Sequence, residues 1–128
     1  MFMNIDINIE GDFSEETILK KFHLEPGGAV QVGIMDACIR YMEPYWAWDT
    51  GRLATSAYAA SDYENGIIIY DTPYAEKMYY GIDETGKAVR YNTSIHPLAG
   101  PYPFERMKAD HLNDILEEAR SIAADEQY

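Results

Sequence analysis

The residues that could carry acid–base or metal chemistry are few and scattered along the chain. The histidines are His23, His96 and His111, and no two of them have a metal-ligand spacing. His111 and Asp114 are three residues apart, which places both side chains on one face of a helix, where they could share a divalent ion. Such a pair on an acidic helix is far more often solvated surface than a metal site. We therefore predict no bound metal.

Candidates for nucleophilic or carboxylate catalysis are equally weak. No serine lies in a Gly-x-Ser-x-Gly element, and Gly27-Gly28 lacks the Lys-Ser/Thr ending of a phosphate-binding loop. Asp36 is the only mild candidate for carboxylate catalysis, although a solvent-facing position on a helix is its more ordinary interpretation. Cys38 falls on an apolar helical stripe, which is typical of a small buried side chain. We predict no catalytic residue and no cofactor.

The chain that positions these residues has the composition of one globular domain. It has 128 residues, of which 47% are hydrophobic and 25% charged. Residues 1–128 are therefore predicted to form a single domain. The longest fully apolar run is Ile67–Tyr70, whereas a membrane span needs about 20 residues. With one cysteine there is no disulfide framework, and we expect a reducing cytoplasm and no membrane contact.

The charge balance excludes one class of function and leaves another open. The chain has 10 basic and 22 acidic residues, a net charge of −12, whereas proteins that bind phosphates show the opposite sign. Direct DNA binding is not expected, although DNA could pass an acidic surface. There are 11 tyrosines. Tyrosine suits surfaces that are wet alone and buried in a complex, but also the rim of a core.

Residues 1–25 are predicted to form a strand followed by a short helix. In residues 1–10 isoleucines alternate with polar residues, the pattern of a half-buried strand. Asp12 and Glu15 form a capping-box pattern that opens a helix ending near His23.

Two longer helices are predicted, over about residues 28–42 and 104–124. Each carries apolar residues at the three- and four-residue intervals of one helix face. Pro44 ends the first, because the residue before a proline is disfavoured in a helix. Residues 82–103 contain several glycines and prolines and no sustained period, so they are predicted to form a long loop.

Between the long helices, residues 54–71 are predicted to form a β-hairpin. Arg52–Ser61 fits either a helix start or a strand, and its small residues without a 3.6-residue period favour a strand. Asn65-Gly66 separates strand-like runs over about Ala54–Tyr63 and Gly66–Asp71, and a two-residue turn of this type needs positive φ at both residues. The turn that leads into this hairpin is assigned to Gly51. A short helix then follows, with its predicted caps at Thr72, Pro73 and Gly81. The predicted fold is α+β, with helices packed on one face of a small antiparallel sheet.

Two groups of short elements resemble a known family. The first comprises Pro44, Asp49-Thr50-Gly51-Arg52-Leu53, Ser56, Tyr70-Asp71-Thr72-Pro73-Tyr74-Ala75 and Met78-Tyr79-Tyr80-Gly81. The second comprises His96-Pro97-Leu98-Ala99-Gly100 and Phe104-Glu105-Arg106-Met107-Lys108-Ala109. In order and spacing they resemble the minor capsid proteins of long-tailed bacteriophages and prophages of Gram-positive bacteria, which are similar to head–tail joining and tail-completion proteins. The resemblance covers about Pro26 to Ala124.

The resemblance implies a structural role without catalysis. It implies a subunit of the connector between capsid portal and tail, located in the virion and in the host cytoplasm during assembly. Its partners would be copies of itself, as a ring that forms from monomers, and other phage head or tail proteins. The residues proposed for these contacts are Trp46, Trp48, Tyr70, Tyr74, Tyr79, Tyr80 and Tyr102. For Tyr74, Tyr79 and Tyr80 a place in the core is equally open, and at least one of them must face inward because so short a helix needs packing.

Simple geometry favours six copies in such a ring. A compact chain of this length has a diameter of about 36 Å, so six touching copies leave a central hole of about 36 Å. B-DNA is about 20 Å across and would pass through it. Three copies would block DNA, and twelve compact copies would leave a far wider opening. DNA is then a passing cargo, and an acidic lumen would keep phosphates from sticking.

Two alternative functions stay open at this point. One is a prophage- or host-encoded interaction module with the same fold and no virion role. The other is a small metal-dependent hydrolase that uses Asp36 or His111. The gene neighbourhood would separate the first from a virion protein, and a thermal shift with divalent ions would reveal the second.

Overall fold

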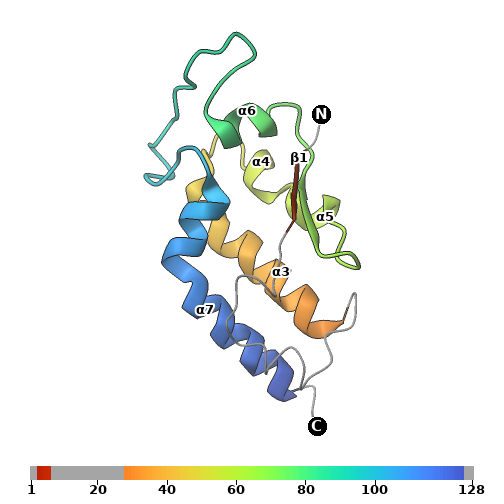
Figure 1. Cartoon of the computed structure of the whole chain (residues 1–128). Coiled ribbons are helices and arrows are strands. Elements are labelled where there is room, and N and C mark those ends of the chain that lie inside the picture. Colours follow the sequence, from red (N-terminus) through yellow and green to blue (C-terminus); the bar gives the residue numbers. More distant parts are fainter. Residues whose placement is uncertain (1–2, 7–27, 126–128) are drawn as a thin grey trace.

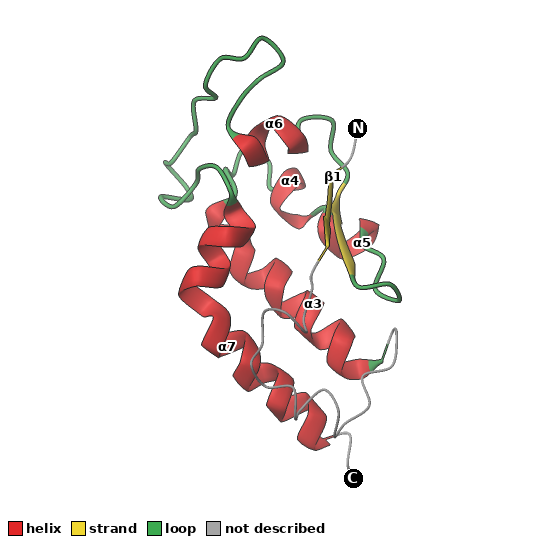
Figure 2. Cartoon of the chain, in the orientation of Figure 1, coloured by secondary structure: helices red, strands yellow, loops and turns green. Residues whose placement is uncertain are grey.

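The chain folds around a pair of long helices, with the short helices and a small sheet at one side (Figures 1 and 2). The computed structural model describes residues 3–6 and 28–125. Its elements, in chain order, are β1 (Met3–Asp6), α3 (Ala29–Met42), the 3-10 helix η1 (Glu43–Tyr45), α4 (Arg52–Thr55), α5 (Ala57–Ala60), β2 (Ile67–Tyr70), α6 (Ala75–Tyr80) and α7 (Pro103–Asp125).

The predicted α+β class is confirmed, with a sheet of two strands in the described part of the chain. The predicted strand is described over β1, and the predicted short helix that ends near His23 lies outside the described residues.

Helices α3 and α7 pack antiparallel and supply most of the core. Both predicted long helices are confirmed within about a residue at each end. Gly33 lets them approach closely, since a Cβ placed there would lie 2.1 Å from Cδ1 of Ile122. The core side chains of α3 face both α7 and the sheet side, namely Val30, Ile34, Met35, Ala37, Cys38, Ile39 and Met42. Burial of this apolar surface is what stabilises the helix pair.

The sheet joins segments that are far apart in the sequence. β1 and β2 are antiparallel, with Met3 opposite Tyr70 and Asp6 opposite Ile67. Along β2, Ile68 and Tyr70 are buried, which gives the strand one core face. A two-stranded sheet is marginal alone, so it depends on the packing of this face.

The predicted hairpin strand over residues 54–63 is wrong. This segment forms α4 and α5, two short helices, and the strand paired with β2 is β1. The physical reason is its alanine content: Ala has the highest helix propensity, and Ala54 and Ala57 are small enough to be fully buried against the core. The pairing with β1 comes from a distant segment that no local pattern indicates.

The turn at Asn65-Gly66 exists but has another geometry. Asp62 and Ile67 exchange two backbone hydrogen bonds of 2.9 and 3.0 Å around a four-residue loop. Gly66 has φ of 71°, whereas Asn65 is outside the left-handed region, so the predicted two-residue turn is wrong. Instead the Asn65 side chain donates a 2.7 Å hydrogen bond to the Asp62 carboxylate, which fixes the loop without positive φ at Asn65.

The start of α6 also differs from the prediction. The helix begins at Ala75, with Tyr74 at the N-cap position, and Thr72 gives no side-chain cap. The Thr72 carbonyl instead accepts a 3.2 Å hydrogen bond from the Ala75 N–H, which makes Pro73 the second residue of a turn, a position that its fixed φ suits. Gly81 has φ of 76°, and its N–H donates a 2.8 Å hydrogen bond to the Lys77 carbonyl, so this residue ends α6.

Two irregular segments complete the fold, the turn at Gly51 and the loop over residues 82–102. Gly51 has φ of 83° and precedes α4, so the turn there leads into a helix. Residues 82–102 form the long loop expected from the sequence, with one isolated bridge between Ile82 and Ala88. Figure 1 shows this loop extending away from the helices before it returns to the start of α7.

Candidate functional site

Aromatic side chains gather where α6, the end of the loop and the start of α7 meet. Tyr79, Tyr80 and Tyr102, here called the tyrosine cluster, make edge-to-face contacts, with ring centroids 5.1, 6.0 and 6.2 Å apart. Tyr79 is 5% exposed, whereas Tyr80 and Tyr102 are 48% and 46% exposed. The cluster therefore has one ring in the core and two rings on the surface.

Hydrogen bonds hold the tyrosine cluster in place. The Tyr102 N–H donates a 2.8 Å bond to the Tyr79 carbonyl, and the Tyr79 hydroxyl donates a 2.5 Å bond to the Glu105 carboxylate. Burial, and then the Glu105 carboxylate, raises the pKa of Tyr79 above its ordinary value. The hydroxyl therefore stays a hydrogen-bond donor at neutral pH.

Three of the predicted contact residues lie in the core of the subunit. Trp46 is buried, and its ring packs against Tyr70 and Tyr79 at centroid distances of 4.6 and 5.9 Å. These rings contact one another and not solvent, so their main role is to hold the subunit together. Trp48 is half-buried and packs on His96 at 5.0 Å. The side chains left for a partner are Tyr74, Tyr80 and Tyr102, with part of Trp48.

The long loop is tied to the body by contacts from several elements. His96 Nδ1 is 2.8 Å from the Trp46 carbonyl, and the Tyr91 hydroxyl donates a 2.7 Å bond to the Met78 carbonyl. Arg106 donates 2.7 and 2.8 Å bonds to the carbonyls of Pro101 and Leu98. The second half of the loop is thus anchored by its own Tyr91 and His96 and by Arg106 of α7.

Shallow grooves flank these elements. The groove between the turn before α4 and α6 holds about 440 Å³ and is lined by Ala47, Asp49, Thr50, Gly51, Arg52, Leu53, Tyr74, Lys77 and Met78. A second, the α6 groove, holds about 390 Å³ and is lined by Pro73, Glu76, Lys77, Tyr80, Ile82, Asp83 and Glu84. A third lies on α7 and is lined by Glu105, Lys108, Ala109, Asp110, Leu112 and Asn113.

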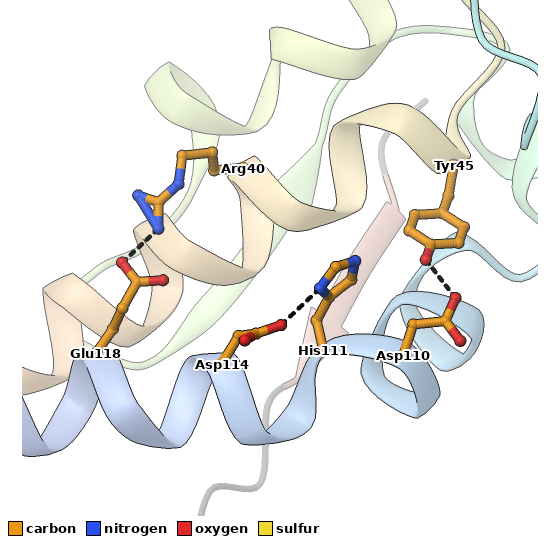
Figure 3. A network of polar contacts seen from close by, with 6 residues as sticks. All are labelled: Arg40, Tyr45, Asp110, His111, Asp114 and Glu118. Carbon is orange, nitrogen blue, oxygen red and sulfur yellow. Dashed lines mark hydrogen bonds and ion pairs between the residues drawn. The ribbon is translucent and has the colours of Figure 1, made fainter.

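A row of polar contacts joins α3 and η1 to α7 (Figure 3). Arg40 of α3 and Glu118 of α7 form a 2.5 Å ion pair, whereas the 2.9 Å contact between Asp114 and Nδ1 of His111 lies within α7. The Tyr45 hydroxyl donates to the Asp110 carboxylate. Burial and this bond raise the pKa of Tyr45 to about 12. The row fixes the register of the two helices.

The candidates for hydrolytic chemistry do not come together. Asp36 is exposed on α3, and its charge raises the pKa of Tyr58 and Tyr63, after the larger effect of their burial. His111 of α7 stacks on Tyr41 of α3, with ring centroids 4.7 Å apart. No hydrogen bond or ion pair between described residues joins Asp36 to His111. Residues 3–6 and 28–125 hold no group of three side chains able to bind a metal, and none of their helices is long and apolar enough to cross a membrane.

Sequence reasoning about these residues missed how the site is held together. It named neither Arg106 nor Glu105 as an anchor, although both lie in an element that the family resemblance includes. Only the three-dimensional path of the loop brings the Arg106 guanidinium to the carbonyls of Leu98 and Pro101. A charged side chain in the first turn of a helix that follows a long loop is the sequence signal that could have found them.

The chain was compared with models of known protein families, with curated proteins and with solved structures. A family model described as "Minor capsid protein" matches residues 14–121. Because the match covers most of the chain, the chain belongs to this family of phage minor capsid proteins. Membership assigns it to the virion, among other phage proteins. Neither a curated protein nor a solved structure matches the chain.

Proposed function

We propose that this chain is a non-enzymatic subunit of the phage head–tail connector, which assembles as a ring around the DNA path. The observation that carries the proposal is the family match over residues 14–121. A minor component of the virion is present in few copies and works through its contacts with neighbours. At the connector, a ring of a few such copies would surround the DNA path between head and tail.

The surface supports a protein that works by contact. Large hydrophobic side chains are exposed on α6 and the adjoining loop, namely Tyr74, Tyr80, Ile82, Ile95, Leu98 and Tyr102. Exposed apolar side chains grouped in this way mark interaction sites. Tyrosines are enriched at such interfaces because the ring is apolar and the hydroxyl finds a partner.

The charge supports passage of DNA without retention. A net charge of −12 makes contact with phosphates unfavourable, which lets DNA slide through a ring lined by this chain. The proposed ring has six copies, from the size estimate of about 36 Å per copy and an equal central hole. We propose that the subunits are monomers in the host cytoplasm and assemble on the head or the tail.

The direct test is deletion of the gene from the phage or prophage that encodes the chain. We expect filled heads and separate tails in electron micrographs, because the joint between them is missing. The wild-type gene supplied in trans is the control and should restore joined particles. Normal particles without the protein would contradict the proposal.

A second test addresses the contact residues. Tyr80→Ser and Tyr102→Ser together remove both exposed rings of the tyrosine cluster and leave the buried Tyr79 in place. We expect the double variant to fold but to restore joined particles at least tenfold less well than wild type. The matched control is Tyr58→Ser, which removes an exposed ring away from α6. If all variants restored joined particles equally well, the tyrosine cluster would not be part of the interface.

A further inference from the structure

The charges of this acidic chain are unevenly placed. Residues 85–102 contain no aspartate or glutamate and carry Lys87 and Arg90, a net charge of +2. The rest of the chain therefore carries −14. Lys87 and Arg90 are exposed, and neither side chain makes a hydrogen bond or ion pair with a residue that the structure describes. The part of the long loop over residues 85–102 is thus a cationic segment, whereas Asp83 and Glu84 at the start of the loop are acidic like the body.

The same loop exposes apolar side chains. Ile95 is 56% and Leu98 is 51% exposed, while the loop backbone around them is held by Arg106 and His96. An anchored loop loses little conformational entropy when it binds, which favours association. Its surface is therefore complementary to a partner surface that carries both acidic and apolar side chains.

The α6 groove has these two properties. Glu76, Asp83 and Glu84 outnumber the single cation Lys77. Tyr80 and Ile82 are exposed beside them and supply an apolar lining. Glu76 and Glu84 make no hydrogen bond or ion pair with any described residue, so their charges are available to another chain. The other groove beside α6 has two cations, Arg52 and Lys77, against Asp49, and does not complement the loop.

We propose that the cationic segment of the loop, residues 85–102, of one copy docks in the α6 groove of the next copy, with Lys87 and Arg90 against Glu76 and Glu84. This inference rests on the proposed function and names the contact that builds the ring. The first residues of the loop, Ile82, Asp83 and Glu84, line the α6 groove, and the cationic segment over residues 85–102 is a different patch next to it. The contact is therefore head-to-tail and leaves a free segment and a free groove at the two ends of the pair. Such contacts repeat until the ring closes.

A second copy fits the loop better than DNA does. Two cations neutralise about two phosphates, which gives weak binding at physiological salt. Ile95 and Leu98 gain nothing from a phosphate backbone, whereas the α6 groove offers them Tyr80 and Ile82. Copies of the chain otherwise repel each other, because the remaining surface is acidic.

Charge exchange tests the contact. The loop variant is Lys87→Glu with Arg90→Glu, the groove variant is Glu76→Lys with Glu84→Lys, and the exchanged variant carries all four substitutions. Sedimentation velocity is measured up to about 1 mM protein in low salt, where charge contacts are least screened. We expect wild type and the exchanged variant to self-associate, and each double variant to do so at least tenfold more weakly. A mixture of the two double variants should associate again.

Several other results would contradict the proposed contact between the loop and the α6 groove. A wild-type chain that stays monomeric throughout, or double variants that associate as well as wild type, would exclude it. Failure of the exchanged variant to associate while its circular dichroism spectrum is that of wild type would do the same. If the loop variant instead loses binding to a 20-base-pair duplex that wild type binds, the loop contacts DNA.

The failure of this contact and the failure of the proposed function give different results. If wild-type protein is missing from purified particles, the connector role fails. If wild type is present and the double variants restore joined particles equally well, the connector role stands and the loop–groove contact is wrong. The exchanged variant should restore particles where both double variants do not.

Discussion

Neighbouring tyrosines in this chain have opposite environments. Tyr79 is buried and donates its hydroxyl to Glu105, whereas the adjacent Tyr80 has its ring at the surface. The difference arises because α6 turns about 100° per residue, so that one ring faces Trp46 and the next faces solvent. At the scale of single residues, tyrosine both builds the core and forms the proposed interface.

The Tyr79 hydrogen bond should matter for stability and the Tyr80 hydroxyl should not. Tyr79→Phe leaves the Glu105 carboxylate without its donor, and we expect a loss of about 1–2 kcal/mol in the free energy of unfolding. Tyr80→Phe is the matched control, with an expected change below about 0.5 kcal/mol. Urea denaturation at neutral pH measures both. Equal effects would mean that the Tyr79 bond contributes nothing.

The Arg40–Glu118 pair should give the protein an acid-sensitive increment of stability. The hydrogen bond from Arg40 lowers the pKa of Glu118, so this stability is present above the unfolded pKa of about 4.3 and is lost as pH falls through the folded pKa. Both side chains are more than a third exposed, which limits the effect to about 0.2–1 kcal/mol.

Glu118→Gln should therefore be less stable than wild type at pH 7, and the difference should shrink as the pH falls from about 5 to about 3. The control is Glu117→Gln, an exposed neighbour whose side chain has no described partner. Urea midpoints across this pH range give the comparison. A gap that stays constant with pH would exclude the ion pair as its source.

Residue roles could be predicted from the sequence only in part. The turn positions Gly51, Gly66 and Gly81 have positive φ, as their residue type suggests. Which aromatic rings are buried could not be predicted, because tyrosine and tryptophan suit both a core and an interface. Trp46 and Tyr70 illustrate this: both were expected at a surface and both lie in the core.

At the scale of elements, long periodic segments were predictable and short ones were not. Helices α3 and α7 follow from apolar residues at helical spacing over many turns. The alanine-rich segment that forms α4 and α5 has too few residues for a period to show. The partner of β2 could not be found locally, since β1 lies more than 60 residues away.

The turn before α4 should be sensitive to any side chain at Gly51. Gly51 has φ of 83°, and a Cβ there would lie 2.3 Å from Cζ2 of Trp48. Gly86 has the same φ but open space around it. We expect Gly51→Ala to destabilise the fold by at least about 2 kcal/mol, and Gly86→Ala by about 1 kcal/mol from backbone strain alone. Chemical denaturation of both variants measures the difference. Similar losses would show that Trp48 moves aside freely.

At the scale of the whole molecule, we propose that residues 1–128 unfold as one domain. Trp46 lies in the core and Trp48 packs against it, so tryptophan fluorescence reports on the core, while circular dichroism reports on the long helices. Urea transitions followed by tryptophan fluorescence and by circular dichroism should coincide, as expected for a two-state domain of this size. Separate midpoints would indicate a second, independent unit.

The whole molecule combines an acidic body, a cationic segment over residues 85–102 and exposed aromatic side chains in one small virion protein. We propose that its charge keeps copies and DNA apart except at the loop–groove contact, which would suit a ring that DNA must cross. The chain contributes shape and contacts to the particle, with no reaction assigned to any of its residues.

Counting copies of the chain in purified, DNA-filled particles tests this account most directly. Quantitative mass spectrometry against a labelled standard of the same protein gives the number per particle. The account predicts about six copies, as a single ring of compact subunits with a central hole of about 36 Å requires. Particles that are joined and infectious yet contain none of the protein, or hundreds of copies spread over the shell, would contradict it.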